Sequence, residues 1–127
     1  MNDERNTKDR PPAQDLVERT KNFALSVIGL YSGLPGTTLA QVMGRQILRA
    51  GTSVGAQYRE ARRAKSDADF ISEIEGALQE LEETAYWLEL LEDSRIVAAS
   101  DATTLRTEAN ELTSILVASV RTVKRRR

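Results

Sequence analysis

Hydrophobic residues recur every three or four positions along most of the chain, and the clearest run lies within residues 66–93. Its seam positions step alternately by four and three residues: Phe70, Ile74, Ala77, Leu81, Thr84, Leu88 and Leu91. This spacing places one apolar stripe along a helix that packs lengthwise against other helices. Ser66 precedes the run and Asp69 follows three residues later, which is the pattern of an N-cap with its capping-box partner. The stretch predicts a helix over residues 67–93.

Three further seams predict helices over residues 15–33, 38–64 and 101–125. In the first, the seam positions are Leu16, Thr20, Phe23, Val27, Leu30 and Leu34. In the second, they are Leu39, Met43, Ile47, Ala50, Val54 and Ala61, with Tyr58 beside them. In the last, they are Leu105, Ala109, Leu112, Leu116, Ser119 and Val123. The expected N-caps of these helices are Asp15, Thr38, and either Ser100 or Asp101.

The arrangement of the helices follows from the short connections between them. Four amphipathic helices joined by short turns predict an all-α fold, an antiparallel up-down-up-down four-helix bundle. Residues 1–14 are polar, contain the Pro11-Pro12 pair and are predicted to be disordered. Residues 15–127 are predicted to form a single domain that ends in a basic tail.

The second predicted helix contains Gly51 and Gly55, although a glycine inside a helix costs about 1 kcal/mol relative to alanine. One alternative is a loop here between two short helices. We favour one long helix, in which small residues let the backbone of a neighbouring helix approach closely.

Composition narrows the possible functions, because the 127-residue chain contains no cysteine and no histidine. Disulfides and thiolate metal sites are therefore excluded, and the commonest general base and metal ligand is missing. No stretch approaches the ~20 apolar residues of a membrane span, and the polar N-terminus is unlike a signal peptide. We expect a cytoplasmic protein that is not an enzyme, has no cofactor and does not contact a membrane.

The net charge of −1 conceals a strong separation of charge along the chain. Residues 66–93 carry ten acidic and no basic side chains, whereas residues 38–65 carry six basic side chains and one acidic. The carboxylates lie off the apolar seam, so a solvated or salt-bridged face is favoured over a metal site. A basic helix beside an acidic one can form pairs within a subunit or between subunits, which specifies partner and register more than stability.

Two linked stretches carry a resemblance to a known family: RAGTSVGAQYREARRAKSDADFI over residues 49–71 and EGALQELEETAYWLELL over residues 75–91. Together they resemble the four-helix-bundle family of 23S rRNA intervening-sequence proteins. That family is similar to the accessory variability determinants of diversity-generating retroelements. The resemblance covers residues 16–123 and implies a homopentameric ring without known enzymatic activity.

The retroelement branch of this resemblance implies a basic, nucleic-acid-binding partner of a reverse transcriptase. This chain departs from that branch, since its net charge is near zero and its pI is about 5.6. Gln57 stands where the family more often has asparagine, and Ala61 where many members have glycine.

Two sets of polar side chains are candidate sites. Arg49, Ser53, Gln57 and Glu60 share one face of the second helix, either as a polar site or, as we favour, as a buried hydrogen-bond network at a helix or subunit contact. Two basic clusters could bind RNA or DNA phosphates. Their members are Arg59, Arg62, Arg63 and Lys65, and Lys124, Arg125, Arg126 and Arg127. Alternatively, the first cluster meets the acidic helix of a neighbouring subunit.

The third predicted helix places Tyr86 and Leu90 opposite its seam, with Trp87 on the flank. Clustered exposed apolar residues mark contacts, so we predict that these three pack against a neighbouring subunit, with Arg59, Arg62 and Arg63 facing its acidic helix. The alternative is that Trp87 covers the edge of its own bundle against the first or last helix. The leading hypothesis is a non-catalytic oligomeric scaffold; the second is a nucleic-acid-binding accessory protein, such as a partner of a retroelement reverse transcriptase.

Overall fold

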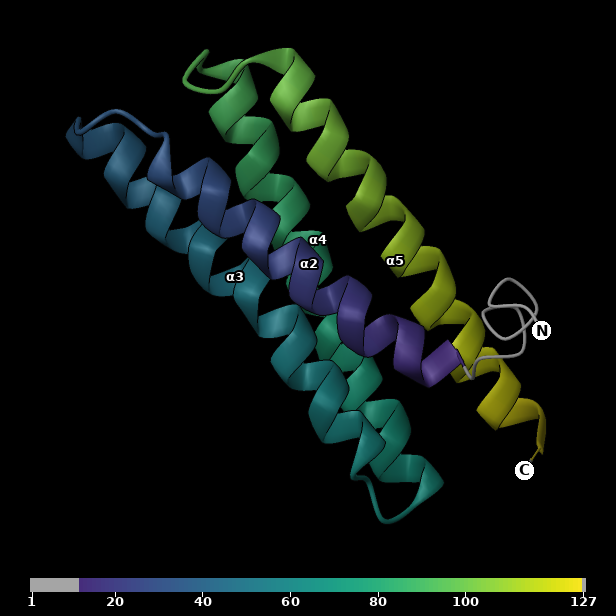
Figure 1. Ribbon diagram of the computed structural model, residues 1–127. Coiled ribbons are helices and arrows are strands. Elements are labelled where there is room, and N and C mark those ends of the chain that lie inside the picture. Colours follow the sequence, from purple (N-terminus) through teal and green to yellow (C-terminus); the bar gives the residue numbers. More distant parts are fainter. Residues whose placement is uncertain (1–11, 127) are drawn as a thin grey trace, which may run out of the picture.

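Four long helices make up the described part of the chain, residues 12–126, in a computed structural model (Figure 1). In chain order they are α2 (Pro12–Ser32), α3 (Thr38–Arg62), α4 (Asp67–Asp93) and α5 (Ala99–Arg126). No strand occurs among these residues, which confirms the prediction of an all-α fold with four helices. No helix in this range is both long and apolar enough to cross a membrane.

The N-terminal ends of the helices are where local prediction was least accurate. Ser66 caps α4 as predicted, and its hydroxyl oxygen accepts a hydrogen bond from the Asp69 backbone N–H at 3.1 Å. The cap of α3 is Thr37, not Thr38, and its side chain accepts from the Ala40 N–H at 3.2 Å. Either threonine suits an N-cap, so the sequence pattern alone does not distinguish them.

The starts of α2 and α5 both lie earlier than predicted. Because α2 begins at Pro12, Asp15 lies inside the helix and is not its N-cap. Proline suits a first turn, where its missing N–H would have had no helical acceptor. Residues 12–14 are therefore helical, and the rest of the predicted disordered segment lies outside the described residues. Likewise, α5 begins at Ala99, so neither Ser100 nor Asp101 caps it.

The core is built mostly from the predicted seams, but five seam positions are not buried: Leu30, Leu34, Leu39, Phe70 and Ser119. Leu39 is 58% exposed, because as the second residue of α3 it lies at the end of the bundle. Phe70 and Ser119 are only partly buried, and their neighbours Ile71 and Val120 are buried instead. A strict four-three pattern drifts around a straight helix of 3.6 residues per turn, which accounts for both one-residue shifts.

The glycines of α3 lie where α2 approaches it, within one uninterrupted helix as we favoured. A Cβ atom added to Gly51 would lie 2.6 Å from Val27 Cγ2, and one added to Gly55 would lie 3.2 Å from Thr20 Oγ1. The approaching atoms nearest to Gly51 belong to a side chain rather than to the backbone that we expected. The missing Cβ atoms therefore bring α2 close to α3.

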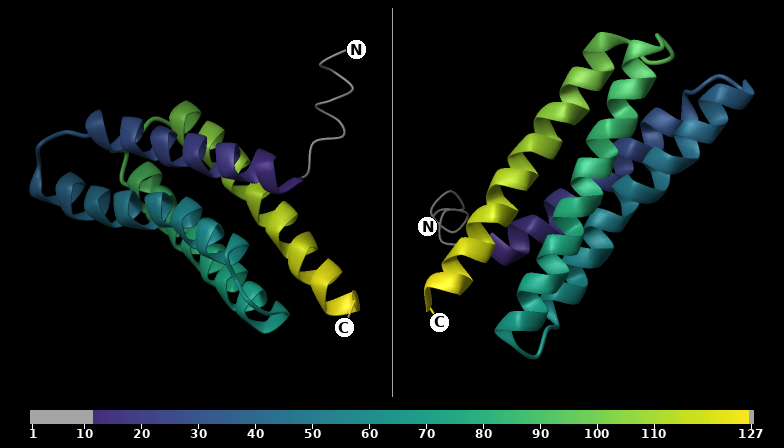
Figure 2. Two further views of the ribbon diagram at one scale, coloured as in Figure 1. Left: turned by 60° about the horizontal axis from the view of Figure 1, so that its bottom comes forward. Right: turned by 180° about the vertical axis from the view of Figure 1, so that it is seen from behind.

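The contact between α2 and α5 is much less complete. Arg19 of α2 donates to Glu108 Oε2 from Nε at 3.1 Å and to Glu108 Oε1 from Nη2 at 2.9 Å, and Nη2 also donates to Glu111 at 2.8 Å. Toward the other end of these helices a cavity opens between them. By contrast, α3 and α4 lie side by side along most of their length (Figure 2).

Candidate functional site

Polar contacts between α3 and α4 show the register of the two helices. Gln57 donates to Glu73 at 2.7 Å, and Arg49 pairs with Glu80 at 3.3 Å and with Glu83. The contacts therefore step backward along α3 as they step forward along α4. Seven residues, or two helical turns, beyond the Arg49 bridges, the same antiparallel register pairs the position of Val42 on α3 with those of Trp87 and Leu90 on α4.

By this register, five apolar residues of the two helices lie toward the same end of the pair, and we call them the α3–α4 patch: Leu39, Val42, Tyr86, Trp87 and Leu90. Leu39, Val42 and Tyr86 are among the most exposed large apolar side chains of the described residues, and Tyr86 is 53% exposed. Its ring meets the Trp87 ring edge to face, with centroids 5.3 Å apart. Such aromatic pairs are stabilised beyond their burial alone and form rigid contact surfaces.

The structure corrects the predicted positions of Trp87 and Leu90. Both are half-buried and pack against the core, so only Tyr86 points fully outward. Trp87 covers part of the core of its own bundle. Its indole Nε1 is buried and has no hydrogen-bond partner among the described residues. Sequence reasoning assigned Leu39 to the core and passed over Val42, because the exposure of both depends on how the helices pack.

The predicted polar row on α3 is not one buried network. Arg49 reaches α4, and Ser53 donates to the backbone carbonyl of Arg49 at 2.6 Å. Gln57 reaches Glu73 over Gly76, where a Cβ atom would lie 2.6 Å from Gln57 Nε2. Glu60 is exposed. The row is therefore a series of separate contacts at the surface of the α3–α4 pair, because long side chains reach the next helix rather than one another.

Several carboxylates of α4 are salt-bridged or hydrogen-bonded, which agrees with the favoured interpretation of the acidic face. Besides the contacts to α3, Glu92 pairs with Arg106 of α5. Among residues 12–126, no three aspartate, glutamate, histidine or cysteine side chains are grouped closely enough to hold a metal ion. The acidic face therefore acts in the described fold as a partner for cations on two neighbouring helices.

The fold brings parts of the two basic clusters together at one end. Arg62 and Lys65, at the end of α3 and the turn after it, line a cavity of about 470 Å³ together with Arg126 of α5. Burial raises the pKa of Tyr58 in this cavity, although the positive charge of Arg62 opposes the shift. The other described members of the clusters are exposed and do not line the cavity: Arg59, Arg63, Lys124 and Arg125. Arg127 lies outside the described residues.

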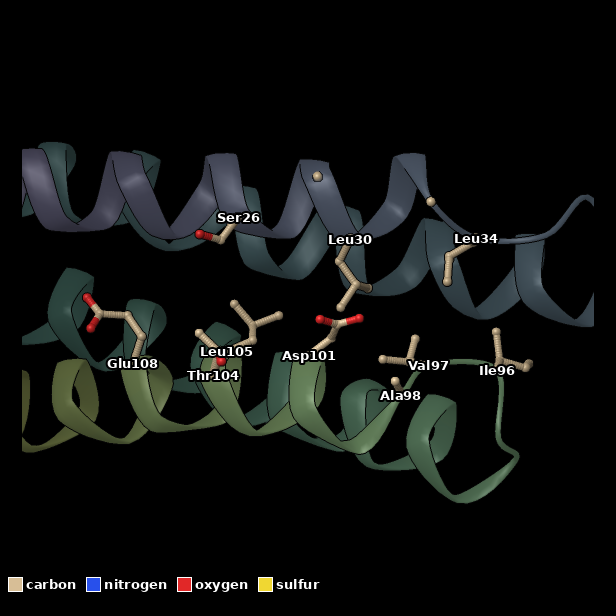
Figure 3. A pocket seen from close by; sticks show the side chains of 12 residues that line it. Ser26, Leu30, Leu34, Ile96, Val97, Ala98, Asp101, Thr104, Leu105 and Glu108 are labelled. Atoms are coloured by element: carbon tan, nitrogen blue, oxygen red, sulfur yellow. The ribbon is translucent and has the colours of Figure 1, made fainter.

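A groove between α2 and α5 was not predicted. It holds a cavity of about 490 Å³, and Figure 3 shows Leu30 of α2 pointing across it toward Leu105 and Asp101 of α5. Gly29 and Gly33 lie on the α2 side. The two glycines in and just after α2 were the available sequence signal, but only the packing shows that they face an opening.

Comparison with known proteins identifies the family. The family model described as 23S rRNA-intervening sequence protein matches residues 13–118. The chain belongs to the 23S rRNA-intervening sequence protein family. A similar solved structure is that of a protein with unknown function from the S23 ribosomal protein family of Bacteroides thetaiotaomicron. The two share 35% identity and a TM-score of 0.81, over 86% of this chain and 97% of the other. A search of curated proteins finds no match.

Some of the candidate sites lie within the residues that the 23S rRNA-intervening sequence protein family model matches, and others extend beyond them. The α3–α4 patch, the α2–α5 groove, Arg62 and Lys65 all fall within the matched residues. The basic residues at the end of α5 lie beyond them. The patch and the groove therefore lie within the region that the family model matches, whereas the cavity at the basic end also uses residues beyond it.

Proposed function

We propose that this family member is a non-catalytic cytoplasmic scaffold whose subunits, antiparallel up-down-up-down bundles, associate through the α3–α4 patch into a ring. The resemblance implies a homopentamer. The observation that carries the proposal is the patch itself. Clustered exposed apolar residues mark interaction surfaces, and buried aromatic anchors contribute much of the energy of interfaces. Arg59, Arg62 and Arg63, on the exposed end of α3, are candidates to meet acidic α4 residues of the next subunit.

Two exposed residues of the patch allow a test that spares the core. The variant combining Val42→Glu with Tyr86→Glu places two charges in the patch, and both sites are at least 49% exposed in the subunit. We expect wild-type protein to scatter light as an oligomer and the variant to scatter as one subunit. The matched control combines Ser114→Glu with Ala118→Glu on the exposed side of α5 and should keep the oligomer.

A wild-type mass of one subunit would refute the scaffold proposal. A patch variant that remains fully oligomeric would refute the choice of the α3–α4 patch as the contact. Far-UV circular dichroism on each variant shows that the helices are retained.

A second candidate function is nucleic-acid binding, as the partner of a reverse transcriptase would require. The observation that favours it is the convergence of Arg62, Lys65 and Arg126 on one cavity, because no ion pair engages these three side chains within residues 12–126. Cations without protein partners can release counterions from a nucleic-acid backbone. The acidic residues of α4 oppose any binding that depends on net charge alone.

Fluorescence anisotropy of a short labelled RNA over a salt series tests this candidate. Binding that weakens steeply with salt, and a slope reduced by roughly one unit for each phosphate contact removed in Arg62→Gln, Lys65→Gln and Arg126→Gln, would support it. The matched controls are Arg45→Gln and Arg121→Gln, two exposed cations that do not line the cavity. Absence of binding at low salt would remove the candidate.

A further inference from the structure

We propose that the α3–α4 patch of one subunit docks on α2 of a second copy, at a surface that we call the α2 face: Leu25, Ile28 and Gly29, with the adjoining groove toward α5. The inference rests on the proposed self-association and names the receiving surface and the symmetry of the contact. The patch and the α2 face share no residue. The contact is therefore head-to-tail, and each subunit uses one surface of each kind.

The helical glycines of the described chain separate into two kinds. A Cβ atom on Gly44, Gly51 or Gly76 would lie 2.6 Å from a side-chain atom of a neighbouring helix or turn, and one on Gly55 would lie 3.2 Å from such an atom. Gly29 differs, because a Cβ atom there would meet nothing within 4 Å. A helical glycine is unfavourable unless something uses its small size. None of the residues that the structure describes does so at Gly29, so a second chain that packs there accounts for it.

The surroundings of Gly29 suit an apolar partner. Leu25 lies four residues before it and is 53% exposed, and Ile28 is 41% exposed. On the other side of Gly29, the groove has apolar walls that include Leu30 and Leu105 (Figure 3). Its volume of about 490 Å³ is in the range of natural ligand pockets, so it can admit the exposed ring of Tyr86 from a second copy.

Charge supports the pairing of these two surfaces. The α2 face has Lys21 four residues before Leu25, and the carboxylate of Asp101 lines the groove on its other side. The α3–α4 patch also has one flank of each sign. Arg45 lies three residues after Val42 on α3, and Glu89 lies three residues after Tyr86 on α4. Docked with Arg45 toward Asp101, the patch places Glu89 toward Lys21, so both flanks are complementary.

Head-to-tail contacts have a distinct consequence for assembly. An open assembly always has one free patch at one end and one free α2 face at the other, so subunits add until a ring closes. A symmetric dimer would instead pair one patch with the same patch of a second copy and leave the α2 face unused. Substitutions on the α2 face should therefore disrupt a head-to-tail assembly but leave a symmetric patch-to-patch dimer unchanged.

Mixing two defective variants tests the pairing directly. The patch variant combines Val42→Glu with Tyr86→Glu, and the α2 variant combines Leu25→Glu with Ile28→Glu; all four sites are exposed, so folding is preserved. We expect each variant alone to scatter light as one subunit. Mixed in equal amounts, they should form a complex of two subunits and no larger species, because only one intact patch and one intact α2 face can meet.

The other outcomes separate this inference from the scaffold proposal. A wild-type protein of one subunit, or an oligomeric patch variant, overturns the proposed self-association through the patch, and the inference with it. An α2 variant that keeps the wild-type mass, while the patch variant does not, overturns the α2 face alone. Two single-subunit variants that fail to combine overturn the pairing of these surfaces. The control with Ser114→Glu and Ala118→Glu should retain the wild-type mass.

Discussion

The two sides of α2 meet their neighbours in different ways. Toward α3, side chains of α2 such as Val27 occupy space left by glycines, and the two helices pack closely. Toward α5, the Arg19 bridges hold one part of the seam, and the rest is a groove. The partner helix explains the difference. Gly51 of α3 admits an α2 side chain, whereas α5 presents Thr104 and Asp101 to the groove, and these do not interlock with Gly29. Helices of similar length and amphipathicity therefore need not pack equally closely.

The largest expected effect comes from adding a side chain on the closed side of α2, the side that packs tightly against α3. Gly51→Val adds a branched side chain whose first atom already lies 2.6 Å from Val27 Cγ2, so we expect a loss of about 3 kcal/mol in the free energy of unfolding. Urea unfolding followed by circular dichroism measures it. The background should be Val42→Glu with Tyr86→Glu, so that any dissociation of an oligomer does not contribute.

A second substitution checks the cause of that loss. Combining Gly51→Val with Val27→Ala should recover part of the loss, because the alanine vacates the space that the new valine needs. If the two losses simply add, the clash with Val27 is not the cause.

A smaller effect is expected from weakening the contact on the open side of α2, the side that faces α5. Arg19→Ala removes the bridges to Glu108 and Glu111, whose side chains are partly exposed, and should lower stability by about 0.5–1 kcal/mol in the same assay. The control is Arg45→Ala, an exposed arginine without an ion pair among the described residues. Equal losses in the two variants would mean that the bridge does not hold α2 to α5.

The sharpest contrast comes from one substitution at two glycines. Gly29→Ala should stabilise the non-assembling background by about 0.5 kcal/mol, because the added methyl meets no atom and favours the helix. Gly51→Ala should destabilise the same background. The same sign at both positions would show that the closed and open sides of α2 do not differ as described.

The smallest expected effect concerns Tyr58, near the end of the α2–α3 contact. It is a change in how steeply the free energy of unfolding falls with pH above about pH 10. Burial raises the pKa of Tyr58 above its ordinary value of about 10. The unfolded chain therefore loses this proton first, so the contribution is constant below pH 10 and stability falls as pH rises through the folded value. Tyr58→Phe should show a shallower fall above about pH 10 in urea titrations at a series of pH values. If stability falls equally steeply with pH with Tyr58 and with Tyr58→Phe, the raised pKa of Tyr58 is contradicted.

Sequence reasoning was most successful where structure is local. Apolar spacing predicted four helices, most of the buried seam positions and the Ser66 cap, since each depends on residues within a few turns of one another. It erred at Leu39, where burial depends on whether a neighbouring helix extends far enough to cover the position. The family resemblance, carried by residues 49–91, was confirmed by the match over residues 13–118.

The sequence by itself determined the helices and the side of each that turns inward, because one chain segment contains the whole of that information. Only the tertiary structure decided that Arg49 reaches Glu80 and Glu83 and that Arg126 joins Arg62. It also decided that Gly51 is covered and Gly29 open. These outcomes depend on the distance and register between helices. Those quantities result from all contacts along both helices together, and no single segment encodes them.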